Sequence, residues 1–112
     1  MMSMRQISFK EFKALDLRIG KVIEAFRVEG SRNLIKMEVD FGTKKLHAVA
    51  GLAKKYKPEE LQDKKYMFIC NLEHMKIMGV ESECMILAAE DGKGNVTLMQ
   101  PEGEIEVGSK IS

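Results

Sequence analysis

The stretch "LDLRIGKVIEAFRV", Leu15–Val28, decides the fold that this sequence predicts. It begins with strict alternation of apolar and polar residues, the pattern of a half-buried β-strand. After Gly20 the phase changes, and the apolar residues Val22 and Phe26 fall on the positions that would now face inward. One extra residue in a strand turns its inward face over and bends it. We therefore predict one long strand with a bulge at the glycine, and bent strands of this kind build closed barrels.

The rest of the chain predicts a series of shorter strands. "LIKMEVDF" alternates cleanly from Ile35 to Phe41, and "KLHAVAG" follows a tight turn as its hairpin partner. "EGSRN" (residues 29–33) predicts the turn that enters this hairpin. Further strands are predicted at "KKYMFICNL" (64–72), "MILAAED" (85–91) and "VTLMQ" (96–100), and "PEGEIEVGSKI" (101–111) predicts a turn with a short terminal strand.

Two short helices are predicted beside these strands. Ser8 and Glu11 have the spacing of a capping box, so a helix that buries Phe9, Phe12 or both should begin there. The charged segment around Pro58 predicts a helical turn between the third and fourth strands. A chain of 112 residues is the size of one domain. The prediction is an all-β protein: a single five-stranded OB-fold barrel over residues 1–112, with residues 1–14 as an N-terminal helical extension and extra C-terminal strands.

The segment "NLEHMKIMGVESECM", Asn71–Met85, lies between the fourth and fifth predicted strands and is too irregular to predict a strand. In OB-folds, oligonucleotides and oligosaccharides lie across the face of strands two and three, bounded by the loops after strands one and four. We therefore expect a binding site at this segment and at "EGSRN".

The side chains of this segment suit more than one ligand. Asn71 and Ser82 offer uncharged hydrogen-bond groups, and Lys76 offers a point charge for phosphate. Gly79 allows close backbone approach or a positive φ. Soft apolar surface for a base or a peptide side chain would come from Met75, Met78 and Met85. The alternative is that the methionines cap the barrel core and the lysine is only solvated.

Charge is unevenly distributed although the net charge is +1. Residues 31–65 hold nine basic and five acidic residues, a net +4, whereas residues 81–112 hold two lysines and seven acidic residues, a net −5. Such asymmetry can mark a phosphate-binding face, or the lysines can simply solvate the surface. The candidates for phosphate contacts in the basic region are Arg32, Lys36, Lys44 and Lys45.

Several other functions find no support in the sequence. It has no nucleophile, phosphate-loop or dinucleotide motif, so no enzyme activity is predicted. Cys70 and Cys84 predict reduced thiols, and together with His47 and His74 they form no paired zinc knuckle, so neither a metal nor a cofactor is predicted. No apolar run reaches the ~20 residues of a membrane helix, and "MMSMRQISFK" lacks the apolar core of a signal peptide. A cytoplasmic protein without membrane contact is expected.

Four segments together resemble a known family: "LDLRIGKVIEA", "VAGLAKKYKPEEL", "NLEHMKIMGVESECMILAAED" and "PEGEIEVGSKI". They are similar to the tRNA-binding domains of methionyl-tRNA synthetase (its C-terminal part or separate beta subunit), of free-standing structure-specific tRNA-binding proteins and of endothelial-monocyte-activating polypeptide. "EGSRNLIK" looks most like the archaeal beta-subunit branch. The resemblance implies an OB-fold homodimer that recognises tRNA by its shape, without chemistry of its own. It would serve as the beta subunit or trans-acting cofactor of a methionyl-tRNA synthetase catalytic subunit.

The family's loop motif falls on five positions of this chain: Asn71, Lys76, Gly79, Ser82 and Met85. With the basic candidates, the predicted tRNA contacts are Arg32, Lys36, Lys44, Lys45, Asn71, Lys76, Gly79, Ser82 and Met85. Three positions depart from the motif, which usually has a basic residue at Met78, a glycine at Cys84 and a proline at His74.

Two other functions remain open. A relative with the same fold is an export chaperone that binds apolar peptides, and the methionines of the loop would suit that role. A single-strand-binding OB module is disfavoured, because stacking aromatics usually carry such binding and the predicted groove strands offer only Phe41, which points inward.

Overall fold

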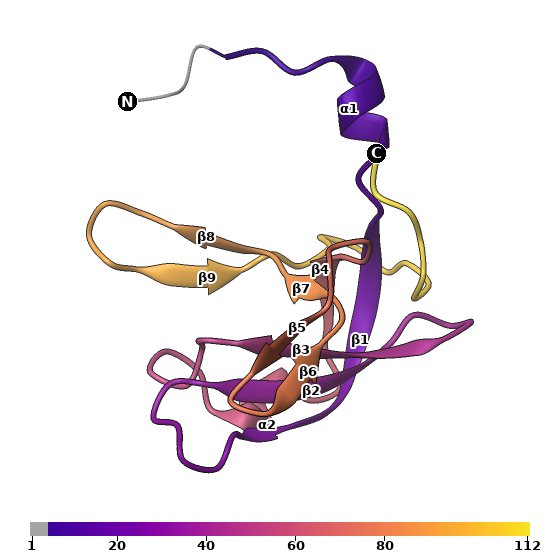
Figure 1. Cartoon of the computed structure of the whole chain (residues 1–112). Coiled ribbons are helices and arrows are strands. Elements are labelled where there is room, and N and C mark those ends of the chain that lie inside the picture. Colours follow the sequence, from indigo (N-terminus) through magenta and orange to yellow (C-terminus); the bar gives the residue numbers. More distant parts are fainter. Residues whose placement is uncertain (1–4) are drawn as a thin grey trace.

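The computed structural model describes residues 5–112, and Figure 1 shows the course of the chain. A short helix precedes a barrel of antiparallel strands, and two small hairpins project from the barrel. In chain order the elements are α1 (Phe9–Lys13), β1 (Leu17–Arg27), β2 (Ile35–Asp40), β3 (Lys45–Ala50), α2 (Pro58–Leu61), β4 (Lys65–Ile69), β5 (Met75–Ile77), β6 (Val80–Ser82), β7 (Met85–Ile86), β8 (Ala88–Glu90) and β9 (Val96–Leu98).

The main sheet has the strand order β3-β2-β1-β4-β7. The long strand β1 lies at its centre, where residues 17–21 pair with β4 and residues 21–27 pair with β2. Because one strand serves both neighbours, the sheet curls into a nearly closed five-stranded barrel. The predicted OB-like all-β fold is confirmed.

The bulge in β1 lies at a different residue from the one predicted. The register with β2 shifts between Val22 and Glu24, so the extra residue is Ile23 and not Gly20. Gly20 faces the core, where an added Cβ would lie 2.6 Å from Val39 Cγ1 and 2.7 Å from the ring of Phe41. Because Gly20 has no side chain, the side chains of Val39 and Phe41 can pack closely against β1 at this point.

The shifted bulge also changes the side to which Phe26 points. Its pairing partner is Lys36 on the outer face of β2, and its side chain is 47% exposed instead of buried as predicted. The Lys36 ammonium lies 5.8 Å from the centre of its ring. Residue Ala25 takes the inward position instead.

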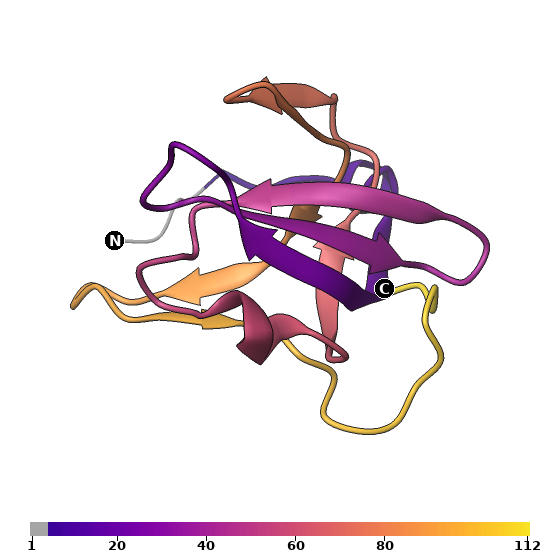
Figure 2. The same ribbon diagram turned by 90° about the horizontal axis from the view of Figure 1, so that it is seen from below.

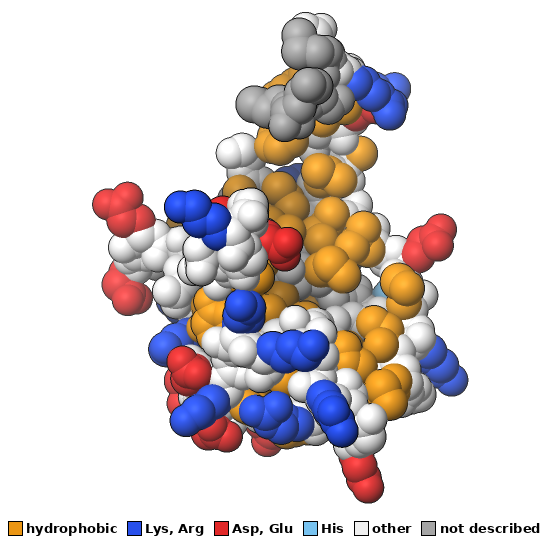
Figure 3. Space-filling model, turned by 90° about the vertical axis from the view of Figure 1, so that its left-hand side faces the viewer, with side chains coloured by type: hydrophobic (Ala, Val, Ile, Leu, Met, Phe, Trp, Pro, Cys, Tyr) orange, Lys and Arg blue, Asp and Glu red, His pale blue; other side chains and the backbone are white. Residues whose placement is uncertain are grey.

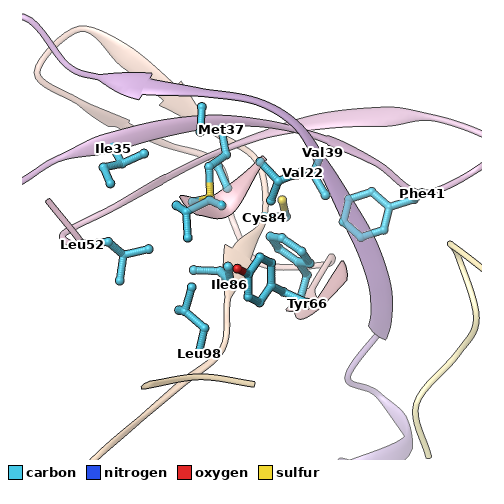
Figure 4. Packing of buried hydrophobic residues seen from close by; sticks show 14 residues of the cluster. Val22, Ile35, Met37, Val39, Phe41, Leu52, Tyr66, Cys84, Ile86 and Leu98 are labelled. Atoms are coloured by element: carbon cyan, nitrogen blue, oxygen red, sulfur yellow. The ribbon is translucent and has the colours of Figure 1, made fainter. Parts of the chain in front are cut away.

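The core fills the barrel with side chains from several strands (Figure 4). Ile35, Met37 and Val39 are completely buried, as the alternation in β2 predicts. Phe41 and Phe68 pack edge to face, with ring centres 5.4 Å apart. Such T-shaped pairs are favoured over face-to-face stacks.

Both predicted helices form, with one correction. Ser8 and Glu11 make the predicted capping box, in which each side chain accepts a hydrogen bond from the other residue's backbone N–H. However, the helix buries neither aromatic residue: Phe9 is 72% exposed and Phe12 is half-buried. Residues 1–4 of the predicted N-terminal extension lie outside the described part of the chain.

The C-terminal third also differs from the prediction. The predicted fifth strand is divided between β7, which pairs with β4, and β8, which leaves the barrel to form a hairpin with β9. Residues 101–111 form no extended strand. Their last part lies along β1, where Lys110 bridges Arg18 and the backbone N–H of Ile111 donates to the carbonyl of Leu17 at 2.8 Å. Within residues 5–112, no helix has both the length and the apolar character needed to span a membrane.

Candidate nucleic-acid interface

The segment predicted as an irregular loop contains a β-hairpin. Strands β5 and β6 pair from Met75↔Ser82 to Ile77↔Val80, and Met78 and Gly79 form the turn with φ values of +51° and +80°. Two-residue hairpin turns of type I′ require a positive φ at both positions. Figure 2 shows this hairpin standing clear of the main sheet, above β2 and β3.

Lys76 lies on the exposed side of this hairpin. It pairs with Glu81 across the ladder, and the Glu81 carboxylate lies 3.3 Å from the Nδ1 atom of His74. No ion pair involves the Lys76 ammonium among the residues that the structure describes, so its charge is available to a ligand.

The base of the hairpin is fixed to β3 by buried polar contacts. The Ser82 hydroxyl accepts a hydrogen bond from the backbone N–H of Val49 at 3.1 Å and donates one to the carbonyl of Cys84 at 3.1 Å. Ser82 is only 7% exposed. Its neighbour Glu83 accepts from the backbone N–H of His47 at 2.8 Å. Ser82 thus fixes the hairpin to the barrel and is largely shielded from solvent, and its predicted contact with RNA stays a prediction.

Asn71 likewise serves the fold. Its Oδ1 atom accepts from the backbone N–H of Asp16 at 2.9 Å, and its Nδ2 atom donates to the carbonyl of Ala14 at 2.7 Å. These bonds tie the chain leaving β4 to the segment between α1 and β1. Because both ends of the amide group are already hydrogen-bonded within the protein, Asn71 has a structural role, and its predicted contact with tRNA stays a prediction.

Met85 belongs to an apolar surface beside the hairpin. Leu72, Met75, Met78 and Met85 are all exposed large hydrophobic residues. A small cavity of about 30 Å³ lies among the side chains of Leu72, Met75, Ile77, Cys84 and Met85. This apolar surface suits a flexible ligand face, whether of RNA or of peptide.

The hairpin tip meets the loop between β1 and β2, here called the first loop (residues 28–34). A Cβ atom built on Gly30 would lie 3.6 Å from the Cε atom of Met78. The two loops that bound the predicted site are therefore neighbours. Arg32 is exposed in the first loop, and Lys36 follows at the start of β2.

Lys44 and Lys45 lie at the other end of the β2–β3 hairpin. Lys45 pairs with Asp40, and the residues from 36 to 40 separate it from Lys36 by roughly 13 Å along the strand. The structure therefore brings Arg32, Lys36, Lys76, Gly79 and Met78 to one end, and leaves Lys44, Lys45 and Met85 towards the opposite end.

An acidic row lies between the two ends. Glu24 pairs with Glu38 across β1 and β2, and Glu38 pairs with His47 on β3. The imidazole of His47 lies between carboxylates, with Nε2 3.7 Å from Glu38 and Nδ1 3.6 Å from Glu83. The paired carboxylates of Glu24 and Glu38 concentrate negative charge in the middle of the sheet face. This charge repels a polyanion, so phosphate binding is unfavourable there.

The thiols do not form a reactive centre. Burial raises the pKa of Cys84 to about 12 and that of Cys70 to about 11. A nucleophilic cysteine needs a lowered pKa. Within residues 5–112, no three His, Cys, Asp or Glu side chains are grouped so as to hold a metal ion.

Sequence reasoning did not identify the hairpin or the acidic row. The type I′ turn gives only a weak signal here, because Met78 stands where Asn or Asp usually precedes the glycine. The sequence indicates that Glu24, Glu38 and His47 lie on the polar side of their strands. Whether they lie next to one another depends on the register between three strands, which the sequence does not show.

Comparisons with known proteins identify similar sequences and structures. Residues 17–110 match the family described as a putative tRNA binding domain. The chain is 46% identical over 108 residues to the methionine–tRNA ligase of Methanocaldococcus jannaschii, a match that covers 96% of this chain and 17% of that enzyme. It therefore spans about a sixth of the length of this curated relative.

Two solved structures resemble the whole chain. The MetRS-related protein from Pyrococcus horikoshii superposes with a TM-score of 0.93 at 36% identity, and the match covers 97% of this chain and 100% of that one. The chaperone CsaA from Bacillus anthracis superposes with a TM-score of 0.86 at 33% identity, and the match covers 96% of this chain and 100% of that one.

Proposed function

Because the chain belongs to the tRNA-binding domain family, we propose that it binds folded tRNA at the end of the barrel where the β5–β6 hairpin meets the first loop. The observation that supports this location is the closeness of Met78 to Gly30, where an added Cβ would lie 3.6 Å from Met78 Cε, so that Lys76 of the hairpin and Arg32 of the loop lie towards the same end. The acidic row disfavours phosphate in the middle of the sheet, which supports binding at this end.

The predicted contact residues divide into two roles. Lys76 and Arg32 neutralise phosphates, and the exposed backbone at Gly79 allows close approach. Met78 and Met85 supply apolar surface against sugars and bases. Ser82 and Asn71 act indirectly, by fixing the hairpin and the segment that leads into it. Such a surface reads the shape of a folded RNA and not its base sequence.

We further propose that the module has no catalytic activity and supplies tRNA affinity to a methionyl-tRNA synthetase, as a beta subunit or trans-acting cofactor in the cytoplasm. The relatives named methionine–tRNA ligase contain a segment similar to this chain, which supports the same pairing of binding module and ligase. A pull-down of purified synthetase catalytic subunit tests this association. No complex at micromolar concentrations would leave the chain as a free-standing binder.

We also propose a homodimer, built partly on α1. Ile7, Phe9 and Leu15 are exposed large hydrophobic residues around this helix, and burying them between two copies removes that apolar surface from water. Sedimentation without RNA at micromolar concentration should find a dimer, and Phe9→Ser should weaken it. A monomeric wild type would contradict this part of the proposal.

A second function has a specific observation in its favour. The exposed side chains of Leu72, Met75 and Met85 line a small cavity, and the chaperone CsaA has a similar structure. An apolar peptide could use that surface without any basic residue.

A gel-shift experiment decides between the two functions. The wild-type protein is mixed with folded tRNA, an unstructured RNA of equal length and a chemically unfolded polypeptide. We expect preference for folded tRNA, with an affinity that falls steeply as salt rises because bound phosphates release counterions. Preference for the polypeptide, insensitive to salt, would support the chaperone function instead.

A further inference from the structure

We propose that the turn between β3 and α2, residues 53–57, forms a second line of phosphate contacts beside the first loop. This inference rests on the proposed binding of tRNA and extends its footprint to a part of the fold outside the two loops that usually bound an OB-fold site. The lysines of this turn are Lys54, Lys55 and Lys57.

The turn is held firmly in place from both sides. Leu52 is 5% exposed, and its carbonyl accepts from the backbone N–H groups of Lys55 at 2.9 Å and Tyr56 at 2.8 Å. The Tyr56 hydroxyl accepts from the backbone N–H of Leu98 in β9 at 3.0 Å. These bonds fix the backbone that carries Lys54 and Lys55. Binding of a ligand to these lysines therefore does not require the turn to become ordered, which reduces the entropy cost of binding.

The same turn is bonded directly to the first loop. The backbone N–H of Ala53 donates to the carbonyl of Asn33 at 2.9 Å, and a Cβ atom on Gly51 would lie 2.8 Å from Asn33 Nδ2. The Ser31 hydroxyl accepts from the N–H groups of Asn33 and Leu34, at 3.2 and 3.1 Å. The backbone at Arg32 therefore lies between two hydrogen-bonded residues, Ser31 and Asn33, and Asn33 is bonded directly to the turn.

Together these two bonded segments carry five basic residues, here called the basic track: Arg32, Lys36, Lys54, Lys55 and Lys57. Within the described residues none of the five forms an ion pair, and the only acidic residue in segments 29–36 and 53–57 is Glu29. Figure 3 shows several Lys and Arg side chains over the lower part of one face of the molecule, with apolar side chains and some Asp and Glu side chains beside them.

The chemistry of the track matches a phosphate backbone. Lysine presents a point charge on a flexible stem, which suits phosphates whose exact positions vary between RNAs. Phosphate contacts position a nucleic acid without reading its bases. The track should therefore add affinity for any tRNA and no preference among tRNAs.

The test compares charge-matched double variants of the full chain. Lys54→Ala with Lys55→Ala removes two charges from the track, and Lys93→Ala with Lys110→Ala removes two charges elsewhere. The first variant should bind tRNA about three- to tenfold more weakly at moderate salt, and the slope of log affinity against log salt should become shallower by roughly 0.7 to 0.9 per lost contact. The control should keep the wild-type slope. Lys54→Arg with Lys55→Arg should restore affinity, because charge and not shape is required.

The outcomes separate this inference from the function on which it rests. If wild type binds tRNA and Lys76→Ala weakens binding, but the Lys54/Lys55 variant matches its control, the track is not a contact surface while tRNA binding at the hairpin stands. If wild type binds no tRNA, both proposals fall. All variants must keep the wild-type melting temperature, which we expect because these side chains are exposed.

Discussion

The hydroxyl of Ser82 accepts a hydrogen bond from the backbone N–H of Val49 at 3.1 Å and so joins the base of the β5–β6 hairpin to β3. The bond is buried, and the same hydroxyl donates to the carbonyl of Cys84. The orientation of the projecting hairpin therefore depends on a contact inside the barrel. Residues that shape the proposed tRNA surface need not touch RNA themselves.

Replacing Ser82 by Ala should lower the free energy of unfolding by roughly 1–3 kcal/mol, since it leaves the Val49 N–H buried without an acceptor. Urea unfolding measures the loss. Binding of tRNA should weaken through misplacement of the hairpin, while the salt dependence of the affinity stays unchanged, because no phosphate contact is removed.

The matched control is Ser109→Ala, which removes a hydroxyl that donates to the carbonyl of Glu106 at the surface. It should leave both stability and binding close to wild type. If Ser82→Ala kept full stability but bound tRNA weakly, its hydroxyl would be an RNA contact after all.

Lys76→Ala should weaken tRNA binding about fivefold, the equivalent of roughly 1 kcal/mol for one charge-assisted contact. Lys45→Ala should have less than half that effect in free energy, because Lys45 pairs with Asp40 at the far end of the sheet, beyond the acidic row. Fluorescence anisotropy with labelled tRNA compares the two variants. Equal losses would mean that binding follows net charge and not the position of the hairpin.

Gly79→Ala should disturb the hairpin turn. Its φ of +80° is strained for any residue with a Cβ, at a cost of about 1 kcal/mol, although no atom crowds the position. The variant should therefore bind tRNA more weakly. Gly92→Ala is the control, since Gly92 also has open space around its Cβ position but no positive φ. Normal tRNA affinity in Gly79→Ala, alongside the loss in stability, would exclude the turn from the interface.

The buried thiol of Cys84 should make the protein less stable at high pH. Burial raises its pKa to about 12 in the fold, from 9.0 for an ordinary thiol. Above about pH 9 the unfolded chain releases this proton while the folded chain keeps it, so unfolding becomes easier as pH rises towards 12. Urea unfolding from pH 8 to pH 10.5 should show a steeper decline for wild type than for Cys84→Ala. Parallel declines would show that Cys84 is not the group responsible.

Alternation along the chain predicted the barrel but not the position of its bulge. The apolar pattern of β1 permits a phase change at any residue from Gly20 to Ile23. Gly20 has no side chain to mark its face, and Phe26 is apolar yet lies outside against Lys36. Only the pairing with β2 distinguishes these positions, and pairing is a property of the fold.

The location of the candidate site stays a prediction, and the sequence did not predict which of its residues hold the fold together. The family motif includes Ser82 and Asn71, and the sequence alone does not distinguish a side chain that binds a ligand from one that holds the loop that binds it. The difference depends on contacts with Val49, Asp16 and Ala14, which lie far away in the sequence. The sequence also could not predict that Phe9 is exposed. An amphipathic pattern predicts an apolar helix face but not whether the same chain or a partner covers it.

The proposed tRNA-binding surface comprises the β5–β6 hairpin, the first loop and the adjacent turn of residues 53–57. An NMR titration of ¹⁵N-labelled protein with substoichiometric folded tRNA tests it most directly. We expect amide signals from residues 76–80, 29–33 and 53–57 to shift or broaden first, while those of Glu24, Glu38 and His47 change least. Changes centred on the acidic row or on Lys44 and Lys45, with the hairpin and first loop unaffected, would contradict it.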